Sequence, residues 1–491
     1  MRKNNLYDKI RNKKFINRNK SIKNKNKNNL IKQKNFTKRK KTFLSRKYAK
    51  IKPNKKIMTK TRIKFYFAYK IIYIFILLLF YLIIFKYYKN NEEINYSIKV
   101  GFYSLSLKYG GVERVTALLL NILSKYKYFI LYSITKFGKK NEEYSIPNNT
   151  KRIYLSEEKK SIYDVLNNEQ IDILIYNFYD RKEIEKLNSL NKTKVIFYNH
   201  SSFLLWIYVN RYNDLLILYP SYKKCKYVLS IIPVENDYLF KKWGINSILI
   251  DNPPTFNYDS VIQSDLSTKC IIMIGRIEDP IKRYELGIRA MPNIIKEIPD
   301  TEMKIISKRS KYYKNMIKSL NLEKSIKITG YEQNVEKYLK NASLHIFPSL
   351  SEAYPMVLSE TKIFGIPSII CGLDYLSLAK GGTVIIYDDN PETIAKEAIK
   401  ILKDDHYRKK LGKEARESMK KRTPKLIGQK WKKILLSVYK GDDKAFKEID
   451  NENKMTEEEA NQILNNQLLL LKRRMPRFSG FSLEKLKSFS F

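Results

Sequence analysis

Apolar runs of strand length alternate along most of the chain with longer stretches in which apolar residues follow helical spacing. This repeated order is typical of parallel sheets that carry helices on both faces. In the first half the runs predict strands at Ile98–Tyr103, Phe129–Ser133, Ile171–Asn177, Lys194–Tyr198 and Tyr227–Ile231. A second series extends from Lys269 to about Leu402. The pattern therefore predicts an α/β protein with two doubly wound, Rossmann-like domains that face each other across a cleft.

Composition and length place the boundaries between the parts of the chain. A length of 491 residues allows two domains and further segments. The segment Thr456–Met475 has an apolar face, basic residues at its end and a capping box of Thr456 and Glu459, so it predicts an amphipathic helix. We expect a low-complexity tail at 1–63, a transmembrane helix at 64–89, domains at 97–251 and 268–425, a linker at 252–267 and a C-terminal extension at 441–491.

The positive charge of the chain is unevenly distributed. Residues 1–63 hold 25 Lys and Arg against the single acidic residue Asp8, so +24 of the net +46 lies in the tail and +22 on the other 428 residues. The tail is rich in Lys and Asn and lacks periodicity, which predicts a disordered, solvated arm. Specific nucleic-acid binding is not indicated, because no helix-turn-helix, zinc-finger spacing or aromatic RNA-binding strand is visible. Attraction to anionic lipid headgroups is a more plausible use.

A hydrophobic segment follows the tail. Ile71–Phe85 is an unbroken apolar run, and Phe65–Tyr69 extends it at the cost of placing Lys70 inside the span. This lysine lies near the entry side and can reach the headgroups. The alternatives are a buried soluble helix or a cleaved signal peptide, which the basic flanks and the long basic region disfavour. We expect a single-pass helix with a cytosolic N-terminus, which puts the domains across the membrane, in the ER or Golgi.

Two cations follow a buried strand in the second half. The apolar run Cys270–Ile274 ends at Gly275, and Arg276 and Lys282 lie in the segment that comes next. Parallel strands present their carboxyl ends at the edge of a sheet where ligands bind. Two fixed positive charges at such a position suit a diphosphate.

A second strand, Leu344–Phe347, leads through the loop Ser349–Tyr354 into a helix for which we expect Pro355 as the first residue. The start of that helix offers unpaired N–H groups and the positive end of its dipole, both of which favour phosphate. Glu352 precedes these donors, and Glu360 lies past the first turn. Carboxylates at these positions are suited to accept hydrogen bonds from ribose or sugar hydroxyls.

In this order, the residues resemble the retaining glycosyltransferases called glycosyl transferases group 1, which have the GT-B fold. The resemblance extends from about Ile98 to Tyr439. Its segments are Gly110-Gly111-Val112-Glu113-Arg114-Val115, Asn252-Pro253, Gly275-Arg276-Ile277 with Lys282, Gly330-Tyr331, Phe347-Pro348-Ser349 with Glu352, Glu360, and Gly365-Ile366-Pro367.

The resemblance implies transfer of a sugar from a UDP- or GDP-linked donor to a lipid, glycan or protein acceptor. It also implies retention of configuration and no metal or other cofactor. The first domain would hold the acceptor, the second would hold the donor, and a helix at 426–440 would return to the first domain. Catalytic roles fall on His200, Arg276, Lys282 and Glu352. Donor-binding roles fall on Gly110, Gly111, Gly275, Ala353, Tyr354, Pro355, Met356, Val357 and Glu360.

The chain departs from the family at two places. Ser307-Lys308-Arg309-Ser310 stands where the family often has a glycine-rich turn, and Ala353 stands where it often has glycine. Both departures support an alternative, a catalytically inactive GT-B scaffold. A further alternative is a membrane-tethered polyanion-binding protein that acts through its basic tail.

The cysteines and histidines give little further chemistry. Cys225, Cys270 and Cys371 are far apart, and Cys270 lies within an apolar run, which predicts core packing for these residues. His345 lies within an apolar strand and is also expected in the core. His200 ends a predicted strand and should face the cleft. No spacing of ligands predicts a metal site.

Overall fold

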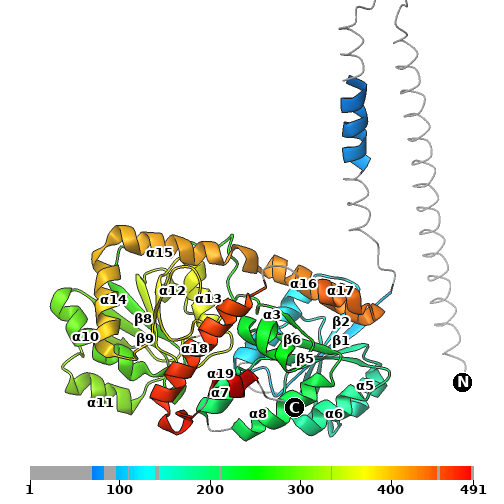
Figure 1. The fold of residues 1–491 in the computed structure, drawn as a ribbon, viewed down its shortest axis with the longest axis horizontal. Coiled ribbons are helices and arrows are strands. Elements are labelled where there is room, and N and C mark those ends of the chain that lie inside the picture. The colour runs from blue at the N-terminus through cyan, green and yellow to red at the C-terminus, as the bar shows by residue number, and fades with distance from the viewer. Residues whose placement is uncertain are drawn as a thin grey trace, which may run out of the picture. The chain divides into compact units, whose positions relative to one another are not determined.

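The computed structural model describes residues 69–81, 96–108, 110–138, 143–209, 212–332, 334–449, 454–480 and 482–487. The chain divides into two compact units, 1–93 and 94–491. In the first unit, residues 69–81 form a helix (Figure 1). The predicted basic tail, 1–63, lies outside the described residues.

The predicted transmembrane segment is described only in part. Residues 64–68 and 82–89 of the predicted span lie outside the described ranges. Among the helices that the structure does describe, none combines the length and the hydropathy needed to cross a membrane. The structure therefore does not support the predicted span.

The second unit contains two parallel sheets, which confirms the predicted α/β fold with two Rossmann-like domains (Figure 1). The first sheet has the order β3-β2-β1-β4-β5-β6-β7 and the second the order β10-β9-β8-β11-β12-β13. The first consists of β1 (Ile98–Ser104), β2 (Phe129–Thr135), β3 (Lys151–Tyr154), β4 (Ile173–Tyr176), β5 (Lys194–Asn199), β6 (Tyr227–Ser230) and β7 (Ser247–Leu249). The second consists of β8 (Cys270–Ile274), β9 (Glu302–Ile306), β10 (Ile326–Ile328), β11 (Leu344–Phe347), β12 (Ser368–Cys371) and β13 (Thr383–Ile386).

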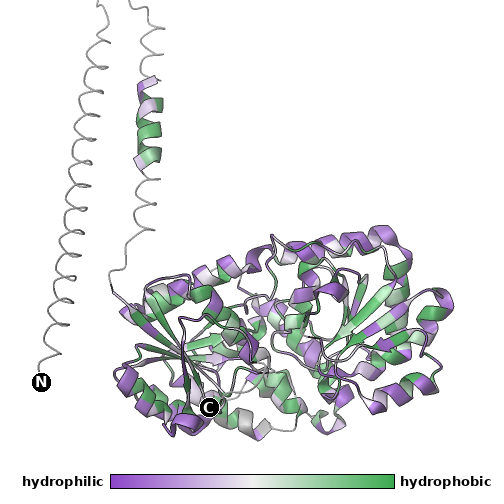
Figure 2. Ribbon diagram, turned by 180° about the vertical axis from the view of Figure 1, so that it is seen from behind, coloured by the Kyte–Doolittle hydropathy of each residue, from purple (hydrophilic) through white to green (hydrophobic). Residues whose placement is uncertain are grey.

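The strand order reverses once in each sheet, between β1 and β4 and between β8 and β11. In doubly wound sheets these switch points open a crevice beyond the carboxyl ends of the strands, where ligands bind. Figure 2 shows the apolar strands inside and the hydrophilic faces of the helices outside. The fold therefore provides one candidate crevice per domain.

Helices and short helical turns connect the strands. In the first domain they are α3 (Gly111–Leu123), α4 (Leu155–Glu158), α5 (Ile162–Glu169), α6 (Arg181–Asn188), α7 (Phe203–Tyr208), α8 (Tyr212–Lys223), the π-helical turn η1 (Glu235–Leu239) and α9 (Phe240–Lys242). In the second they are η2 (Pro280–Lys282), α10 (Tyr284–Glu297), α11 (Lys311–Ser319), α12 (Glu336–Leu339), α13 (Met356–Ile363), α14 (Pro391–Lys403), α15 (Asp405–Ser418) and η3 (Lys420–Arg422). The remaining helices are α16 (Pro424–Lys440), α17 (Asp443–Glu448), α18 (Glu457–Arg474), η4 (Pro476–Phe478) and α19 (Leu483–Lys487).

Helix α16 follows the second domain in sequence but packs against α3 and β4 of the first. Trp431 is fully buried, and its ring centroid lies 6.3 Å from that of Phe102 and 5.4 Å from that of Tyr198. Burial of a tryptophan in such a position contributes several kcal/mol, since truncation of a core aromatic costs about 3–5 kcal/mol. The last part of the family-like region therefore completes the core of the first domain.

Helix α18 begins close to its predicted start, but the predicted capping box is wrong in one half. Thr456 is the N-cap and accepts a hydrogen bond from the backbone N–H of Glu459. The carboxylate of Glu459 pairs instead with Lys380 of the second domain. A tertiary ion pair has replaced the local contact that the sequence pattern suggested.

The three cysteines are buried and not paired with one another, and His345 is fully buried in the second sheet, as predicted. Nδ1 of His345 lies 3.2 Å from the hydroxyl of Ser368. Burial lowers the pKa of His345 to about 3, so the folded protein keeps this imidazole neutral.

The neutral state of His345 makes stability depend on pH. An unfolded histidine titrates near pH 6.5. Below that pH the unfolded chain therefore binds a proton at this residue, whereas the folded chain keeps it neutral down to about pH 3. Acidification from pH 7.5 to 5 should therefore remove about 2 kcal/mol of unfolding free energy through this group. His345→Asn should reduce the loss by that amount in urea titrations at the two pH values. Gln429→Asn, at an exposed position of α16, should leave the loss unchanged.

Candidate functional site

The candidate site lies at the switch point of the second sheet. Strand β8 has β9 on one side and β11 on the other, and all three run parallel. Their carboxyl ends lead into Gly275 with Arg276, into Ser307–Ser310 and into Ser349–Tyr354. Because parallel strands end at the same edge, the three loops converge.

Two predicted catalytic residues, Lys282 and Glu352, form an ion pair. Lys282 Nζ lies 2.5 Å from Glu352 Oε1, and the two side chains are only 18% and 13% exposed. Lys282 ends η2, whose first turn is capped by Asp279, and its ammonium lies 5.5 Å from the centroid of the Phe347 ring. The sequence-predicted cation is therefore present at the strand ends, and its charge is balanced by Glu352.

The second predicted cation, Arg276, is open to solvent. Its side chain is 67% exposed and its nearest partner is Asp279, with an N–O distance of 3.2 Å. Arg276 also acts across the crevice on Glu113, in the first turn of α3: burial raises the pKa of Glu113, and the positive charge of Arg276 opposes that rise. Arg276 therefore lies close enough to the first domain for its charge to act on Glu113.

The loop after β11 is held from behind by Tyr375. Its hydroxyl accepts a hydrogen bond from the backbone N–H of Glu352 at 3.0 Å and donates one to the carbonyl of Glu352 at 2.8 Å. The N–H of Leu350 binds the carbonyl of Ile281 at 2.7 Å. These contacts fix the backbone that carries Glu352 relative to the segment that carries Lys282.

Helix α13 starts one residue later than predicted. Pro355 is its N-cap, with φ −71° and ψ 105°, and the first helical residue is Met356. The N–H groups of Met356 and Val357 lie in the first turn, where helix geometry gives them no intrahelical acceptor. Ala353 is not among the residues with positive φ, so its methyl group introduces no backbone strain there. Tyr354 is buried beside it.

Three glycines follow the strands at the two switch points, Gly110 and Gly111 after β1 and Gly275 after β8. Gly110 is the N-cap of α3, and a side chain there would collide with the carboxylate of Glu113. At Gly111 a Cβ atom would have open space around it, with no neighbouring atom within 4 Å. Gly275 has φ +147°, a conformation that disfavours other residues. The backbone can therefore be approached closely at Gly111.

Glu360, predicted to bind ribose, bridges the two domains. It is 1% exposed, and its Oε1 lies 3.0 Å from Nη1 of Arg114 in α3 and 2.7 Å from the hydroxyl of Thr255. Both contacts engage the same oxygen. The sequence placed Arg114 in the family's first glycine-rich segment but did not predict this ion pair.

His200 follows β5 at the carboxyl edge of the first sheet. Its Nε2 lies 3.0 Å from Oδ1 of Asn177, whose amide nitrogen donates to the carbonyl of Tyr103. Since that amide oxygen can only accept, Nε2 carries the proton and Nδ1 presents a lone pair. Burial against surroundings that include the Tyr198 ring lowers the pKa of His200 to about 3. His200 is therefore a neutral hydrogen-bonding group at physiological pH.

Sequence reasoning missed Glu235, the first residue of the π-helical turn η1. It is fully buried; Oε1 accepts from the N–H of Phe203 at 2.7 Å and Oε2 from the amide of Asn199 at 3.3 Å. Burial raises its pKa to about 8. It ties together the two sides of the loop that carries His200. The signal was an acidic residue directly after the apolar run Ile231–Val234, which follows β6.

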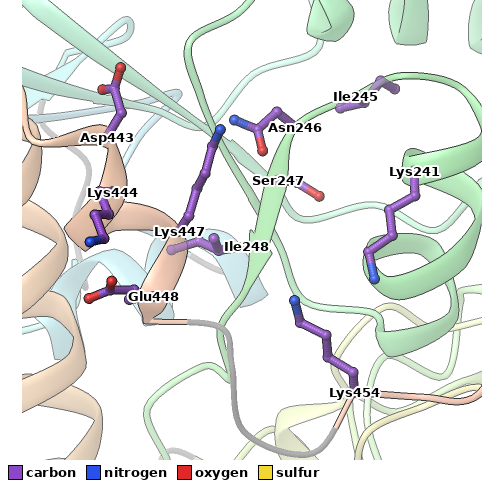
Figure 3. A pocket seen from close by; sticks show the side chains of 10 residues that line it. All are labelled: Lys241, Ile245, Asn246, Ser247, Ile248, Asp443, Lys444, Lys447, Glu448 and Lys454. Atoms are coloured by element: carbon purple, nitrogen blue, oxygen red, sulfur yellow. The ribbon is translucent and has the colours of Figure 1, made fainter.

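A separate hollow of about 480 Å³ lies far from these loops in the topology (Figure 3). Asn246 and Ser247, at the amino end of β7, line it together with residues of α17. Lys241 and Lys454 extend into it. Because it opens at the opposite end of the strands, we do not assign it to the candidate site. A smaller hollow is lined by Lys282 and the ends of β8 and β11.

Comparison with known proteins supports the family resemblance. Residues 256–418, which cover most of the second domain, match the family model described as Glycosyl transferases group 1. The chain is 26% identical to an uncharacterized glycosyltransferase of Haemophilus influenzae over 55% of this chain and 80% of that protein. It is 23% identical to a Campylobacter jejuni N-acetylgalactosaminyltransferase that acts on an undecaprenol-linked glycan, over 70% and 99% of the two chains.

Solved structures share the fold. Sucrose-phosphate synthase from Thermosynechococcus elongatus superposes with a TM-score of 0.60 at 13% identity, over 70% of this chain and all of that one. HepE of Anabaena, solved with UDP and glucose, gives a TM-score of 0.57 at 14% identity, over 69% and 100%. At such identities the likeness establishes the two-domain architecture.

Within the ranges described above, no group of three or more His, Cys, Asp or Glu is arranged to hold a metal ion.

The bridge between Arg114 and Glu360 can be tested by substitution. Arg114→Ala leaves a buried carboxylate with Thr255 as its remaining partner, and loss of one partner of a buried pair costs about 3–5 kcal/mol, less here because Arg114 is partly exposed. Arg114→Ala with Glu360→Gln should be more stable than Arg114→Ala alone, since the unpaired charge is gone. Urea unfolding measures both. Arg181→Ala, which breaks an exposed pair in α6, should change stability by less than about 1 kcal/mol. A double variant no more stable than Arg114→Ala would contradict the interpretation.

Proposed function

We propose that the chain is a glycosyltransferase that moves a sugar from a nucleotide-diphosphate sugar to an acceptor hydroxyl. The observation that carries this proposal is the convergence of Arg276, Lys282 and the start of α13 at the switch point of the second sheet. That sheet lies within the region that matches the family model. The relatives named above are glycosyltransferases, which supports the same reaction class.

The donor would lie across the carboxyl ends of β8 and β11. Its diphosphate would take the exposed guanidinium of Arg276, the ammonium of Lys282 and the N–H groups of Met356 and Val357. Arg114 and Thr255 occupy Oε1 of Glu360, so the ribose would donate to Oε2. Because this carboxylate is only 1% exposed, the residues that cover it would have to move aside for the ribose to enter. UDP bound to HepE supports a uridine nucleotide, with GDP as the other choice.

The transfer would retain configuration. The bond between the anomeric carbon and the phosphate oxygen breaks, the acceptor oxygen bonds to the same face of that carbon, and its proton passes to the departing phosphate. Arg276 and Lys282 would stabilise the charge that develops on the leaving group. Glu352 and the Nδ1 lone pair of His200 would accept hydrogen bonds from sugar hydroxyls. In this mechanism Arg276 and Lys282 supply the positive charge at the leaving group, and no metal ion takes part.

The acceptor would bind on the side of the first domain, where Gly111 leaves the backbone accessible. The Campylobacter relative acts on an undecaprenol-linked glycan, which supports a lipid-linked glycan as the acceptor class. Protein and free glycan acceptors belong to the same proposal.

An inactive scaffold is the second candidate. It is favoured by the ion pair that balances Lys282 and by Ser307, whose hydroxyl accepts from the N–H of Ile277 at 2.9 Å where the family often has a glycine-rich turn. If the chain is an active glycosyltransferase, the donor phosphate would displace Glu352 from Lys282, and the freed carboxylate would turn toward the sugar.

We also propose attachment to a membrane through residues 64–89, on the basis of the apolar run Ile71–Phe85 and its basic flanks. Protease added outside sealed vesicles should remove the basic tail and leave a protected fragment that begins near Lys64. Digestion of the domains with protection of the tail would reverse the orientation, and complete digestion would refute a spanning segment.

The leaving-group assignment predicts a loss of turnover without a comparable loss of stability. Removal of one transition-state donor typically lowers kcat by about 10²–10³. Arg276→Ala and Lys282→Ala should each show a loss of this order with UDP- or GDP-sugars. Arg276→Ala should leave stability near that of the wild type, because its side chain is 67% exposed. Lys282→Ala should also lose some stability, because it leaves the mostly buried carboxylate of Glu352 without its partner. Arg289→Ala, at an exposed position of α10, is the control and should keep wild-type kcat.

If both variants turn over donor at the wild-type rate, the diphosphate site is misassigned. If the folded wild type transfers no sugar from a panel of UDP- and GDP-sugars, the scaffold interpretation replaces the enzymatic one.

A further inference from the structure

The C-terminal extension packs across both domains. Figure 1 shows α18 lying along the junction between them. On the first domain, the hydroxyl of Tyr238 lies 3.0 Å from Oδ1 of Asn461. On the second, the amide of Gln467 donates to the carbonyl of Gly372 at 2.7 Å and to Asp374 at 2.5 Å. The extension lies beyond the region that resembles the family.

The last residue of α18, Arg474, is buried and fully engaged. Its Nε and Nη2 bind the two carboxylate oxygens of Asp389 at 2.6 and 2.7 Å, a bidentate pair. Its Nη1 binds the carbonyl of Leu350 at 3.3 Å and the hydroxyl of Tyr208, in the first domain, at 3.2 Å. One guanidinium thus joins both domains and the loop after β11.

Asp389 connects Arg474 to Arg283, which lies next to Lys282 in the chain. Its Oδ1 lies 2.9 Å from Nη1 of Arg283, and Nε of Arg283 donates to the carbonyl of Pro348 at 2.7 Å. Arg283 directly follows Lys282, and Leu350 lies two residues before Glu352. The network therefore supports both members of the Lys282–Glu352 pair from behind.

The backbone of this network needs support. Arg283 has φ +48° and Asp389 has φ +54°, conformations that side-chain-bearing residues rarely adopt. Such conformations persist where surrounding contacts over-determine them. Burial alone would raise the pKa of Asp389, but the bonds from Arg474 and Arg283 lower it, so the carboxylate stays ionised and keeps both arginines in place.

We propose that Arg474 is a positioning residue for the donor site, through which the C-terminal extension sets the geometry of the loop Ser349–Tyr354 and of Lys282. Arg474 touches neither donor nor acceptor. The inference rests on the proposed function for the identity of the ligand, but not for the ordering of the loop.

The test uses the full chain and two readouts, hydrogen–deuterium exchange over Ser349–Tyr354 and calorimetric titration with UDP and with GDP. Arg474→Ala should speed exchange of the loop amides at least 10-fold and weaken nucleotide affinity at least 10-fold. Arg474→Lys keeps the charge but not the bidentate geometry, so its losses should be intermediate. Asp389→Asn should resemble Arg474→Ala, and the double variant should be no worse than either, because one network is removed once.

Two controls separate positioning from general stability. Arg473→Ala removes the neighbouring exposed arginine, which binds the carbonyl of Tyr387, and should change both readouts less than 2-fold. Leu464→Ala lowers thermal stability through a buried residue of the same helix about 15 Å away, yet should keep wild-type affinity below its unfolding range.

Loop exchange in Arg474→Ala or Arg474→Lys that matches Arg473→Ala would overturn the inference. An affinity loss as large in Leu464→Ala as in Arg474→Ala would overturn it as well, because it would show general loosening. If the wild type binds neither UDP nor GDP, the proposed function fails, and the exchange data still decide the positioning role.

Discussion

Parallel strand direction is the constraint on which the rest of this structure depends. Each strand of either sheet must be followed by a crossover before the next can pair in the same direction, so all the carboxyl ends gather at one edge. In the second sheet this brings together loops that lie far apart in sequence, one after β8, one after β9 and one after β11. The side chains that follow these strands can be polar, because the loops lie at the edge of the sheet and outside the apolar core. The chemistry of the site is thus a consequence of topology.

Charge in the crevice is balanced by local and interdomain pairs. Lys282 is paired with Glu352, Glu360 with Arg114, and Arg276 lies opposite Glu113. A bound diphosphate would change this balance because it adds negative charge beside Lys282 and Arg276. Under the proposed function, donor binding would therefore be coupled to the arrangement of the carboxylates through electrostatics, and Glu360 would extend that coupling to both domains.

The sequence was sufficient for the central strands and for placing Lys282 and Glu352 after neighbouring strands, and insufficient wherever distant segments compete with local patterns. Strand β11 has its predicted limits because it is buried on both faces and reads as a continuous apolar run. The edge strands β3 and β7 are short and mixed in polarity, and no prediction covered them.

The pairing of side chains is harder to predict than the strands. Lys282 and Glu352 were predicted individually from motif spacing. Their mutual pairing, like the pairs of Glu360 with Arg114 and of Glu459 with Lys380, depends on side chains that only the tertiary fold brings close. Asp389 and Arg474 carry no local signal at all, since their bond joins residues that belong to different segments of the fold.

The burial of Trp431 between Phe102 and Tyr198 has a consequence for biosynthesis. The first domain is made first by the ribosome, but the helix that fills this part of its core is translated only after the whole second domain. Until then an apolar surface beside β1 and β5 has no cover, and nascent domains with such surfaces are prone to associate with other chains. The contact also has a very long sequence separation, which slows folding because loop closure must precede it. The first domain should therefore complete its core only after α16 has been translated, and until then it should be more prone to association than the complete chain.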